Sequence, residues 1–211
     1  MGMVKGKNPT LIVFDLEATC WDRGENAGNW NDADPNYMKI DSPTWKQVHE
    51  METIEIGAVK LDIKNYEIID QFQTFIRPIL NPELTDFCKK LTTITQKNVS
   101  NAPDFKEAFM SFRRWAGRPF YYVGWGQYDY RQLRRDCDRC GVGLFSEDRY
   151  LNGKDEYFRF TGKRAGGLGK AVRRHNLTFE GTHHRAISDA IMTAKVLQCA
   201  RKELEEKMGP R

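Results

Sequence analysis

LIVFDLEATC, which spans Leu11 to Cys20, joins an apolar run to two closely spaced acids. Four apolar residues lead directly into Asp15, and Leu16 separates Asp15 from Glu17. A short apolar run of this kind is typical of a strand that is buried on both faces. Because side chains alternate along a strand, Asp15 and Glu17 are expected to point the same way. The stretch therefore predicts two neighbouring carboxylates at the end of a central strand.

Two carboxylates this close do not both stay ionised at neutral pH without help from a cation. Oxygen ligands suit hard divalent cations such as Mg²⁺ or Mn²⁺. The plain alternative is a strand end with two solvated acids, and a lone D-x-E after an apolar run does not separate the two interpretations. The choice depends on whether further acids follow downstream in suitable settings.

The length and composition are those of an ordinary globular protein. The chain has 211 residues, of which 40% are hydrophobic and 29% are charged, enough for one sizeable α/β domain with its own core. No apolar run approaches the length of a membrane span, so no membrane contact is expected. The N-terminus, MGMVKGKNPT, lacks the apolar segment of a secretory signal. We expect a tail over residues 1–9 and a single domain over residues 10–207.

The five cysteines indicate a reducing, intracellular environment. Their odd number and scattered positions do not suggest a disulfide framework, so a cytoplasmic location is expected. Cys137 and Cys140 form a C-x-x-C on a predicted helix, without a second pair at zinc-binding spacing. Helix packing is therefore favoured over zinc or redox chemistry for this pair.

Positive and negative charges are unevenly divided along the chain. Residues 1–112 carry 12 Lys and Arg against 17 Asp and Glu, whereas residues 113–211 carry 21 against 12. The two parts therefore have net charges of −5 and +9, which sum to the +4 of the whole chain. An acidic half beside a basic half suits a metal site that faces a polyanion, although such asymmetry also arises by chance.

Loop-forming residues dominate the thirty residues from Trp21 to Glu50. This segment, called the flap below, is long for a loop in a compact domain, and such loops are often functional or disordered. Its aromatic residues argue against full disorder. We expect either an ordered flap near the site or a segment that packs onto the body of the domain.

The rest of the chain has the pattern of a mixed sheet. Partial alternation predicts an antiparallel hairpin from residues 53–62 and 66–77, and PFYYVG at 119–124 predicts another buried strand. Arg149 to Phe160 is interpreted as one edge strand. Helices are expected over 82–90, 103–116, 128–140, 167–175 and 185–207. This order predicts an α/β fold with a mixed five-stranded sheet, an antiparallel edge and helices on both faces.

Two more acids and a histidine occupy positions that favour a site. Asp129 follows the strand PFYYVG, where α/β proteins place binding groups, but a single acid at this point also serves to cap a helix. His184 precedes Asp189 by five residues. This spacing suits a His on the loop or first turn that leads into a helix and an Asp just over a turn later. For a lone His–Asp pair, a place on the surface is the default interpretation.

Taken together, the four acids and the histidine resemble the DEDDh family of 3′–5′ exonucleases. The matching segments are FDLEATC at 14–20, VGWGQYD at 123–129 and HRAISD at 184–189. Further matches are TIEIGAV at 53–59, LTTITQ at 91–96 and GGL at 166–168, so the resemblance spans nearly the whole chain. It looks closest to the sub-branch that includes the histone-mRNA 3′ exonuclease and the enhancer-of-RNA-interference nucleases. The flap is longer than this family leads us to expect.

The resemblance implies a ribonuclease H-like fold and a metal-dependent hydrolase. The ligands of two Mg²⁺ or Mn²⁺ ions would be the four acids, Asp15, Glu17, Asp129 and Asp189. His184 would take the proton from an attacking water as general base, and cleavage of the last phosphodiester would release a nucleoside 5′-monophosphate. The family spacing to Asp189 selects His184 for this role and leaves the adjacent His183 as a phosphate contact or bystander.

The residues that would hold the terminal nucleotide are expected close to these acids. The candidates outside the basic cluster are Leu16, Ala18, Thr19, Trp21, Thr92 and Trp125. The two small apolar residues would bracket the base, the tryptophans would stack on it and the threonines would bond phosphate or the terminal 3′-OH. A basic cluster that includes Lys163 and Arg164 would contact upstream phosphates. Core or rim packing for the tryptophans and a solvated helix face for the cluster stay open as alternatives.

The expected partner is the 3′ end of single-stranded nucleic acid. The motif does not decide between RNA and DNA, because that choice rests on contacts to the 2′-OH, but the sub-branch favours RNA. A binding module that has lost catalysis, and a protein-interaction scaffold with incidental acids, are the alternatives to an enzyme. All five residues of the motif are present, which favours the exonuclease.

Overall fold

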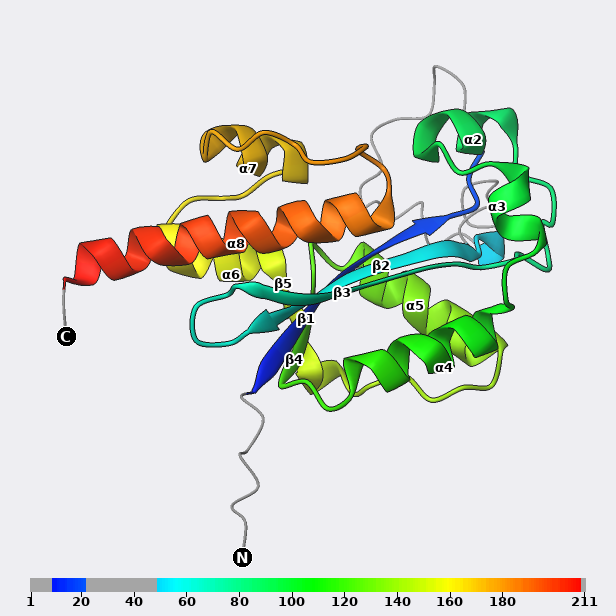
Figure 1. Cartoon of the computed structure of the whole chain (residues 1–211), viewed down its shortest axis with the longest axis horizontal. Coiled ribbons are helices and arrows are strands. Elements are labelled where there is room, and N and C mark those ends of the chain that lie inside the picture. The colour runs from blue at the N-terminus through cyan, green and yellow to red at the C-terminus, as the bar shows by residue number, and fades with distance from the viewer. Residues whose placement is uncertain (1–8, 22–48, 210–211) are drawn as a thin grey trace, which may run out of the picture.

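The computed structural model describes residues 9–21 and 49–209. The predicted tail and the predicted flap therefore lie almost wholly outside the described residues. Within them, five strands form one sheet in the order β3-β2-β1-β4-β5 (Figure 1). The strands are β1 (Thr10–Ala18), β2 (Thr53–Asp62), β3 (Ile68–Phe75), β4 (Tyr121–Gly124) and β5 (Tyr150–Asn152).

The sheet has one antiparallel half and one parallel half. β2 pairs antiparallel with both β1 and β3, whereas β4 pairs parallel with both β1 and β5. β1 is the central strand, and its apolar run from Leu11 to Phe14 is buried on both faces. The predicted mixed sheet with an antiparallel edge is confirmed, as is the central position of the first strand.

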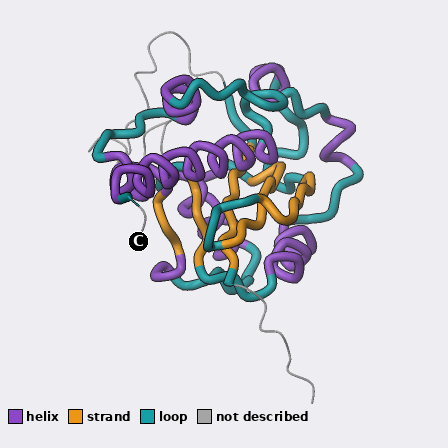
Figure 2. The backbone as a smooth tube through the Cα atoms, turned by 60° about the vertical axis from the view of Figure 1, so that its left-hand side comes forward, coloured by secondary structure: helices purple, strands orange, loops and turns teal. Residues whose placement is uncertain are grey.

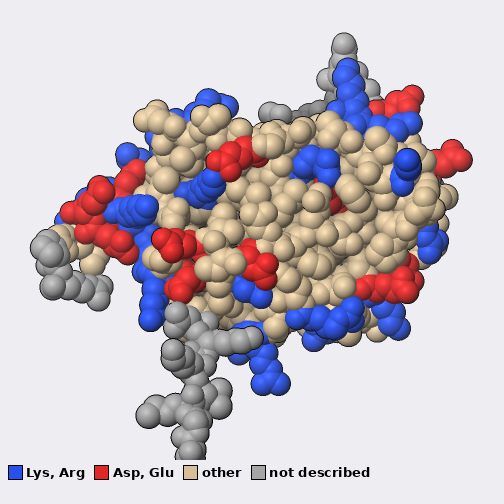
Figure 3. Space-filling view, in the orientation of Figure 1, with Lys and Arg blue, Asp and Glu red and all other residues tan. Residues whose placement is uncertain are grey.

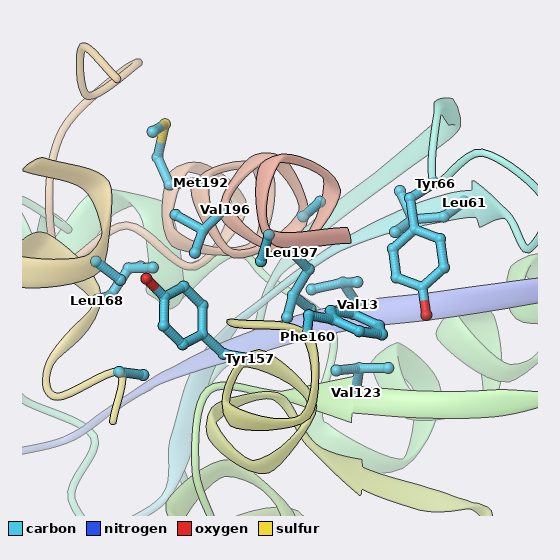
Figure 4. Packing of buried hydrophobic residues seen from close by; sticks show 14 of the residues in the cluster. Val13, Leu61, Tyr66, Val123, Tyr157, Phe160, Leu168, Met192, Val196 and Leu197 are labelled. Carbon is cyan, nitrogen blue, oxygen red and sulfur yellow. The ribbon is translucent and has the colours of Figure 1, made fainter. Parts of the chain in front are cut away.

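One face of the sheet is covered by α6 (Gly153–Thr161) and α8 (Ala186–Met208), and α7 (Leu168–Arg174) packs against α8 in the same core. Leu11 and Val13 belong to the core of this layer together with Tyr157 of α6 and Leu197 of α8. Figure 4 shows Val13, Tyr157 and Leu197 in this core. α8 is the long helix that runs across the sheet in Figures 1 and 2. Because odd-numbered residues of β1 face this layer, Asp15 and Glu17 continue the same row toward the end of the strand.

The opposite face is covered by α4 (Phe105–Ala116) and α5 (Tyr128–Arg139). Ile12 and Phe14 point into this second layer, where Phe109 and Phe112 of α4 are fully buried. α4 begins at a capping box, in which the side chains of Asp104 and Glu107 each accept a hydrogen bond from the other's backbone. Helices on both faces therefore match the predicted layer arrangement.

A third, smaller core lies beside the end of β1. It is formed by α2 (Asp86–Thr92), α3 (Gln96–Ser100) and Ile54 of β2. Cys88 of α2 is buried there, and its thiol donates a 3.7 Å hydrogen bond to the carbonyl oxygen of Ala18. The end of β1 is therefore also held by this third core, in addition to the two main helical layers.

The predicted edge strand from Arg149 to Phe160 is wrong over most of its length. A 3₁₀ turn, η2 (Glu147–Arg149), leads into β5, and the chain then enters α6 directly. Asn152 caps α6 by accepting a hydrogen bond from the backbone N–H of Lys154. Tyr157 and Phe160 lie three residues apart and are both buried, which suits a helix rather than a strand.

The C-x-x-C pair has the structural role expected for it. None of the five cysteines, all of which the structure describes, forms a disulfide. Cys137 is fully buried in the core under α5, and burial raises the pKa of its thiol to about 12. A thiol in this environment is unreactive at neutral pH.

The surface carries both signs of charge. On the face seen in Figure 3, acidic and basic side chains are interspersed around the rim, and neither sign dominates. Over the described residues, no helix combines the length and apolar character needed to cross a membrane.

Candidate active site

The end of β1 carries the first two acids of the candidate site. Asp15 lies opposite Gly57 and Glu17 lies opposite Glu55 in the antiparallel pairing with β2. Glu17 is only 9% exposed, and Asp15 is partly exposed. The two carboxylates therefore share the face that α8 covers, as the alternation along LIVFDLEATC predicted.

α8 brings the third acid to this pair. Asp189 lies in the first turn of α8, where it is 6% exposed. One oxygen of each carboxylate of Asp15, Glu17 and Asp189 lies within 4.8 Å of the others. Oδ2 of Asp189 accepts a 3.3 Å hydrogen bond from the backbone N–H of His184, which ties the loop before α8 to the same group.

α5 provides the fourth acid from the parallel side of the sheet. Asp129 is in the first turn of α5 and is 5% exposed. Its Oδ1 accepts a 3.3 Å hydrogen bond from the backbone N–H of Leu16, the residue between Asp15 and Glu17. The carboxylate also accepts a hydrogen bond from its own backbone N–H at the start of the helix. Asp129 therefore does more than cap a helix: the N-cap residue of α5 is Gln127, and the Asp129 carboxylate reaches β1.

Burial and mutual repulsion make these four carboxylates reluctant to ionise. Burial, followed by repulsion from neighbouring acids, raises the pKa of Asp15 and Glu17 well above their usual values. Burial likewise raises the pKa of Asp129 to about 7 and that of Asp189 to about 6. Acids placed together at this energetic penalty mark a functional site more often than a structural one.

The residues present fit a hard divalent cation. Among the described residues, Oδ1 of Asp189 is buried and has no hydrogen-bond partner, so it is available as a ligand. The neighbouring donor atoms of Asp15 and Glu17 are carboxylate oxygens, which suit Mg²⁺ or Mn²⁺ rather than a soft metal. A bound cation would also reverse the electrostatic penalty, because it favours the ionised form of every carboxyl group around it.

Two histidines flank Asp189. His184 has a left-handed backbone with φ of +62°, two residues before α8 begins, so the predicted place on the loop before the helix is confirmed. Burial lowers the pKa of His184, and the neighbouring His183 lowers it further. The two imidazole rings are 4.2 Å apart, and Nδ1 of His183 lies 3.8 Å from Oδ2 of Asp189. The structure therefore brings both histidines to the acid, whereas family spacing alone selected His184.

Four of the residues predicted to contact the nucleotide are buried, namely Leu16, Ala18, Thr19 and Thr92. The side chain of Leu16 packs in the core under α4 and α5. The Thr92 hydroxyl donates to the carbonyl oxygen of Cys88 at 2.8 Å and accepts from the N–H of Ile94 at 3.1 Å. Thr19 Oγ1 accepts from the N–H of Glu52. The predicted phosphate contact of Thr92 thus disagrees with the structure, because its hydroxyl is fully buried and already bonded.

The other predicted substrate residues lie at the surface. Trp21 and Trp125 are partly exposed, and Lys163 and Arg164 are exposed. Nε1 of Trp125 donates a 3.2 Å hydrogen bond to the carbonyl oxygen of Gly166, and its ring meets Tyr157 edge-on. One edge of the Trp125 ring is therefore fixed by the turn that carries the basic residues. Its role as a stacking surface for a base stays a prediction.

Two charged residues near the acids escaped the sequence reasoning. Glu55 is fully buried beside Glu17, although an ionisable residue inside the apolar strand TIEIGAV was a visible signal. Lys154 lies at the start of α6, and its Nζ is 3.4 Å from the position that a Cβ on Gly126 would occupy. Its positive charge partly opposes the rise that burial causes in the pKa of Asp129. Lys154 lay inside the segment misinterpreted as a strand, which hid its direction.

Comparisons with known proteins agree with this geometry. A family model described as Exonuclease matches residues 12–197. ERI1 exoribonuclease 2 of Xenopus laevis is 24% identical over 88% of this chain, and 3′-5′ exonuclease Snipper of Drosophila melanogaster is 26% identical over 85%. The aligned regions cover 27% and 65% of those two proteins. The nuclease domain of 3′hExo, a DEDDh family member solved with bound rAMP, superimposes with a TM-score of 0.71 at 22% identity, covering 92% of each chain.

Proposed function

The chain belongs to the DEDDh exonuclease family, and from this we propose that it is a metal-dependent 3′–5′ exonuclease. It would remove nucleoside 5′-monophosphates from the 3′ end of single-stranded nucleic acid, with RNA as the preferred substrate. The observation that supports this most directly is the convergence of Asp15, Glu17 and Asp189 within 4.8 Å, with one buried Asp189 oxygen unpartnered among the described residues.

The four carboxylates are proposed to hold two divalent cations, Mg²⁺ or Mn²⁺. When bound, the cations would lower the pKa of the attacking water and offset the charge that develops on the phosphate and the leaving 3′ oxygen. Asp15 and Glu17 extend from the rigid central strand, and Asp129 is tied to that strand through Leu16 N–H. These contacts hold proposed ligands from different elements in a fixed relation to one another.

His184 is proposed to accept the proton of the attacking water. The lowered pKa of its imidazole favours the neutral form at pH 7, which is the form able to take a proton. The hydrogen bond from its backbone N–H to Asp189 keeps the residue at the edge of the acid cluster. His183, stacked 5.0 Å from Phe179, is assigned a supporting role in contact with the substrate phosphate.

The preference for RNA is inferred from the relatives. One is called an exoribonuclease, and one solved neighbour contains a ribonucleotide, rAMP. Exposed Lys163 and Arg164, together with Lys154 near Asp129, are proposed to contact the phosphate backbone. Discrimination against DNA would require a contact to the 2′-OH in addition to these charges.

A shortening assay tests the proposal. Single-stranded RNA and DNA oligonucleotides, labelled at the 5′ end or at the 3′ end, are incubated with wild type or Asp15→Ala in Mg²⁺, Mn²⁺ or EDTA. The 5′-labelled strand should shorten one nucleotide at a time, and RNA should shorten faster than DNA. No shortening is expected in EDTA or with the Asp15→Ala variant.

The same assay separates the two histidines. His184→Ala should lose most of the rate because the proton acceptor is gone, whereas His183→Ala should weaken substrate binding more than turnover. If wild type binds the oligonucleotides but never shortens them with either metal, the proposed exonuclease activity is excluded. A nucleic-acid-binding module is then the better description of the protein.

A further inference from the structure

Glu55 is an ionisable residue at a position where burying a charge is energetically unfavourable. It lies on β2 directly opposite Glu17 and is 0% exposed. Like charges on directly opposed positions of a strand pair destabilise a sheet. Repulsion from Glu55 also contributes to the raised pKa of Asp15, Glu17 and Asp189. An apolar residue would avoid this penalty, so the carboxylate must do something at this position that an apolar residue does not.

Arg185 explains how the charge is tolerated. Its Nε donates to Oε2 of Glu55 and one terminal nitrogen donates to Oε1, both at 3.1 Å, in a two-point pair. The guanidinium also lies over the ring of Phe75, 5.2 Å from the ring centre. A bidentate arginine–carboxylate pair fixes orientation as well as distance. Glu55 therefore holds the Arg185 side chain in one direction.

Glu55 also completes the start of α8. Arg185 is the N-cap residue of α8, and its own side chain makes no capping hydrogen bond within the described residues. Instead, Oε2 of Glu55 accepts a 3.2 Å hydrogen bond from the backbone N–H of Ala186, the first residue of the helix. An acid at this position satisfies an otherwise unpaired N–H and interacts favourably with the helix dipole. The cap of α8 is thus supplied by the strand that lies next to β1.

A close backbone contact gives α8 a second point of attachment. A Cβ on Gly57 would lie 2.0 Å from the backbone nitrogen of Ile187, so the helix start rests directly on β2. Gly57 faces Asp15 across the strand pair, just as Glu55 faces Glu17. The two anchors therefore define where the first turn of α8 lies relative to both acids of β1. Asp189 follows Ile187 by two residues in that same turn.

We propose that Glu55, acting through Arg185 and the first N–H of α8, is a positioning residue for the metal site. It holds Asp189 and His184, which lie at the start of α8, at the working distance from Asp15 and Glu17. The inference rests on the proposed metal-dependent function of this site. It concerns contacts between this chain's own residues.

Metal binding by the intact chain tests the proposal without relying on catalysis. Mn²⁺ is titrated into EDTA-stripped wild type and Glu55→Gln by calorimetry, and the Mn²⁺-dependent rise in Tm is recorded in parallel. Partners that orient metal ligands typically change metal affinity or activity about 10- to 100-fold when they are replaced. Glu55→Gln is therefore expected to weaken Mn²⁺ binding about 10- to 100-fold and to lower kcat, with KM for the oligonucleotide unchanged.

Asp136→Asn is the matched control. Asp136 is another buried acid paired with an arginine, 2.8 Å from Arg139, and it accepts hydrogen bonds from Thr53 at the start of β2. Among the described residues, no hydrogen bond or ion pair joins Asp136 directly to the four acids of the site, so its loss should lower Tm but leave Mn²⁺ affinity as in wild type. If Glu55→Gln lowers Tm yet binds Mn²⁺ like wild type, Glu55 is merely structural and the proposal is overturned.

Arg185→Lys covers the case in which Glu55→Gln fails to fold. A lysine keeps the charge but cannot make the two-point pair, so an intermediate loss of Mn²⁺ affinity is expected. Wild-type Mn²⁺ affinity in this variant would overturn the proposal. If wild type binds Mn²⁺ but never shortens an oligonucleotide, the proposed function fails by itself, and the Mn²⁺ titrations still decide the role of Glu55.

Discussion

Replacing Asp129 by Asn is expected to stabilise the metal-free protein while abolishing the proposed activity. The Asp129 carboxyl is buried at the start of α5, and burial raises its pKa from 3.8 to about 7. An amide carries no charge to bury, and its oxygen can still accept the hydrogen bond from Leu16 N–H. The variant therefore keeps the geometry of the site and removes the electrostatic penalty along with one proposed metal ligand.

The size of the effect follows from the pKa values. Each pKa unit corresponds to about 1.4 kcal/mol, so a shift from 3.8 to about 7 makes ionised Asp129 about 4 kcal/mol unfavourable in the folded state. This is an upper value, because water entry and relaxation reduce the penalty of a buried charge. One kcal/mol shifts Tm by about 2–4 °C in a domain of this size. A gain of several degrees is expected for Asp129→Asn in EDTA above pH 7.

The sign of the pH dependence gives the sharpest test. Below about pH 4 the carboxyl of Asp129 is protonated in both the folded and the unfolded chain, so it does not affect stability. Between about pH 4 and 7 the folded protein keeps a proton that the unfolded chain has released, so the free energy of unfolding falls as pH rises. The difference between variant and wild type should therefore grow from pH 5 to pH 8 and then level off.

Thermal unfolding in EDTA across this pH range measures that difference. Asp138→Asn is the control, because Asp138 is an exposed acid on the same helix and should change stability by less than about 0.5 kcal/mol. Mn²⁺ should raise the Tm of wild type at pH 8 more than that of Asp129→Asn. A variant that is less stable than wild type, or a difference that does not depend on pH, would refute the reasoning.

Three further predictions concern other parts of the molecule. Gly57→Ala should lower Tm and Mn²⁺ affinity, because its Cβ would lie 2.0 Å from the backbone of α8, whereas Gly143→Ala, with nothing within 4 Å, should behave as wild type in the same titration. Phe112→Ala, in the core under α4, should cost about 3–5 kcal/mol in urea unfolding, and a cost near zero would contradict the packing described. The Cys88 thiol, whose pKa a hydrogen bond with Cys20 lowers to about 7, should show thiolate absorbance with a midpoint near that pH, absent in Cys88→Ser.

The central strand and its acids were predictable because period-two alternation leaves little freedom. Once Leu11 and Val13 face one layer, Asp15 and Glu17 must follow them on the same side. The spacing from His184 to Asp189 correctly indicated a His on the loop before a helix and an Asp in its first turn, although the family resemblance was needed to assign the pair to a site. These inferences depend on residues close together in sequence, where backbone geometry alone decides which side chains are neighbours.

Features that depend on pairing between distant segments were harder to predict. Glu55 meets Glu17 only through the register of β1 and β2, and Arg185 reaches Glu55 across 130 residues of sequence. The segment from Arg149 to Phe160 was misassigned because its few apolar residues fit a short strand and a short helix about equally well. Thr92 looked available because a sequence shows the hydroxyl but not the buried helix end to which it is bonded.

The candidate site brings together opposed requirements, and the contacts around α8 show how they are reconciled. Gathering Asp15, Glu17 and Asp189 favours cation binding but destabilises the metal-free fold, since each carboxyl raises the pKa of the others. Movement of α8 away from the sheet would relieve this repulsion, but apolar residues of the helix such as Val196 and Leu197 are buried in the core and oppose it. The Glu55–Arg185 pair resists that movement with a contact that adds no net charge. If Glu55 holds the start of α8 as proposed, the carboxylates can relax only by taking up protons or a cation, and their repulsion then contributes to the affinity of the site for a metal ion.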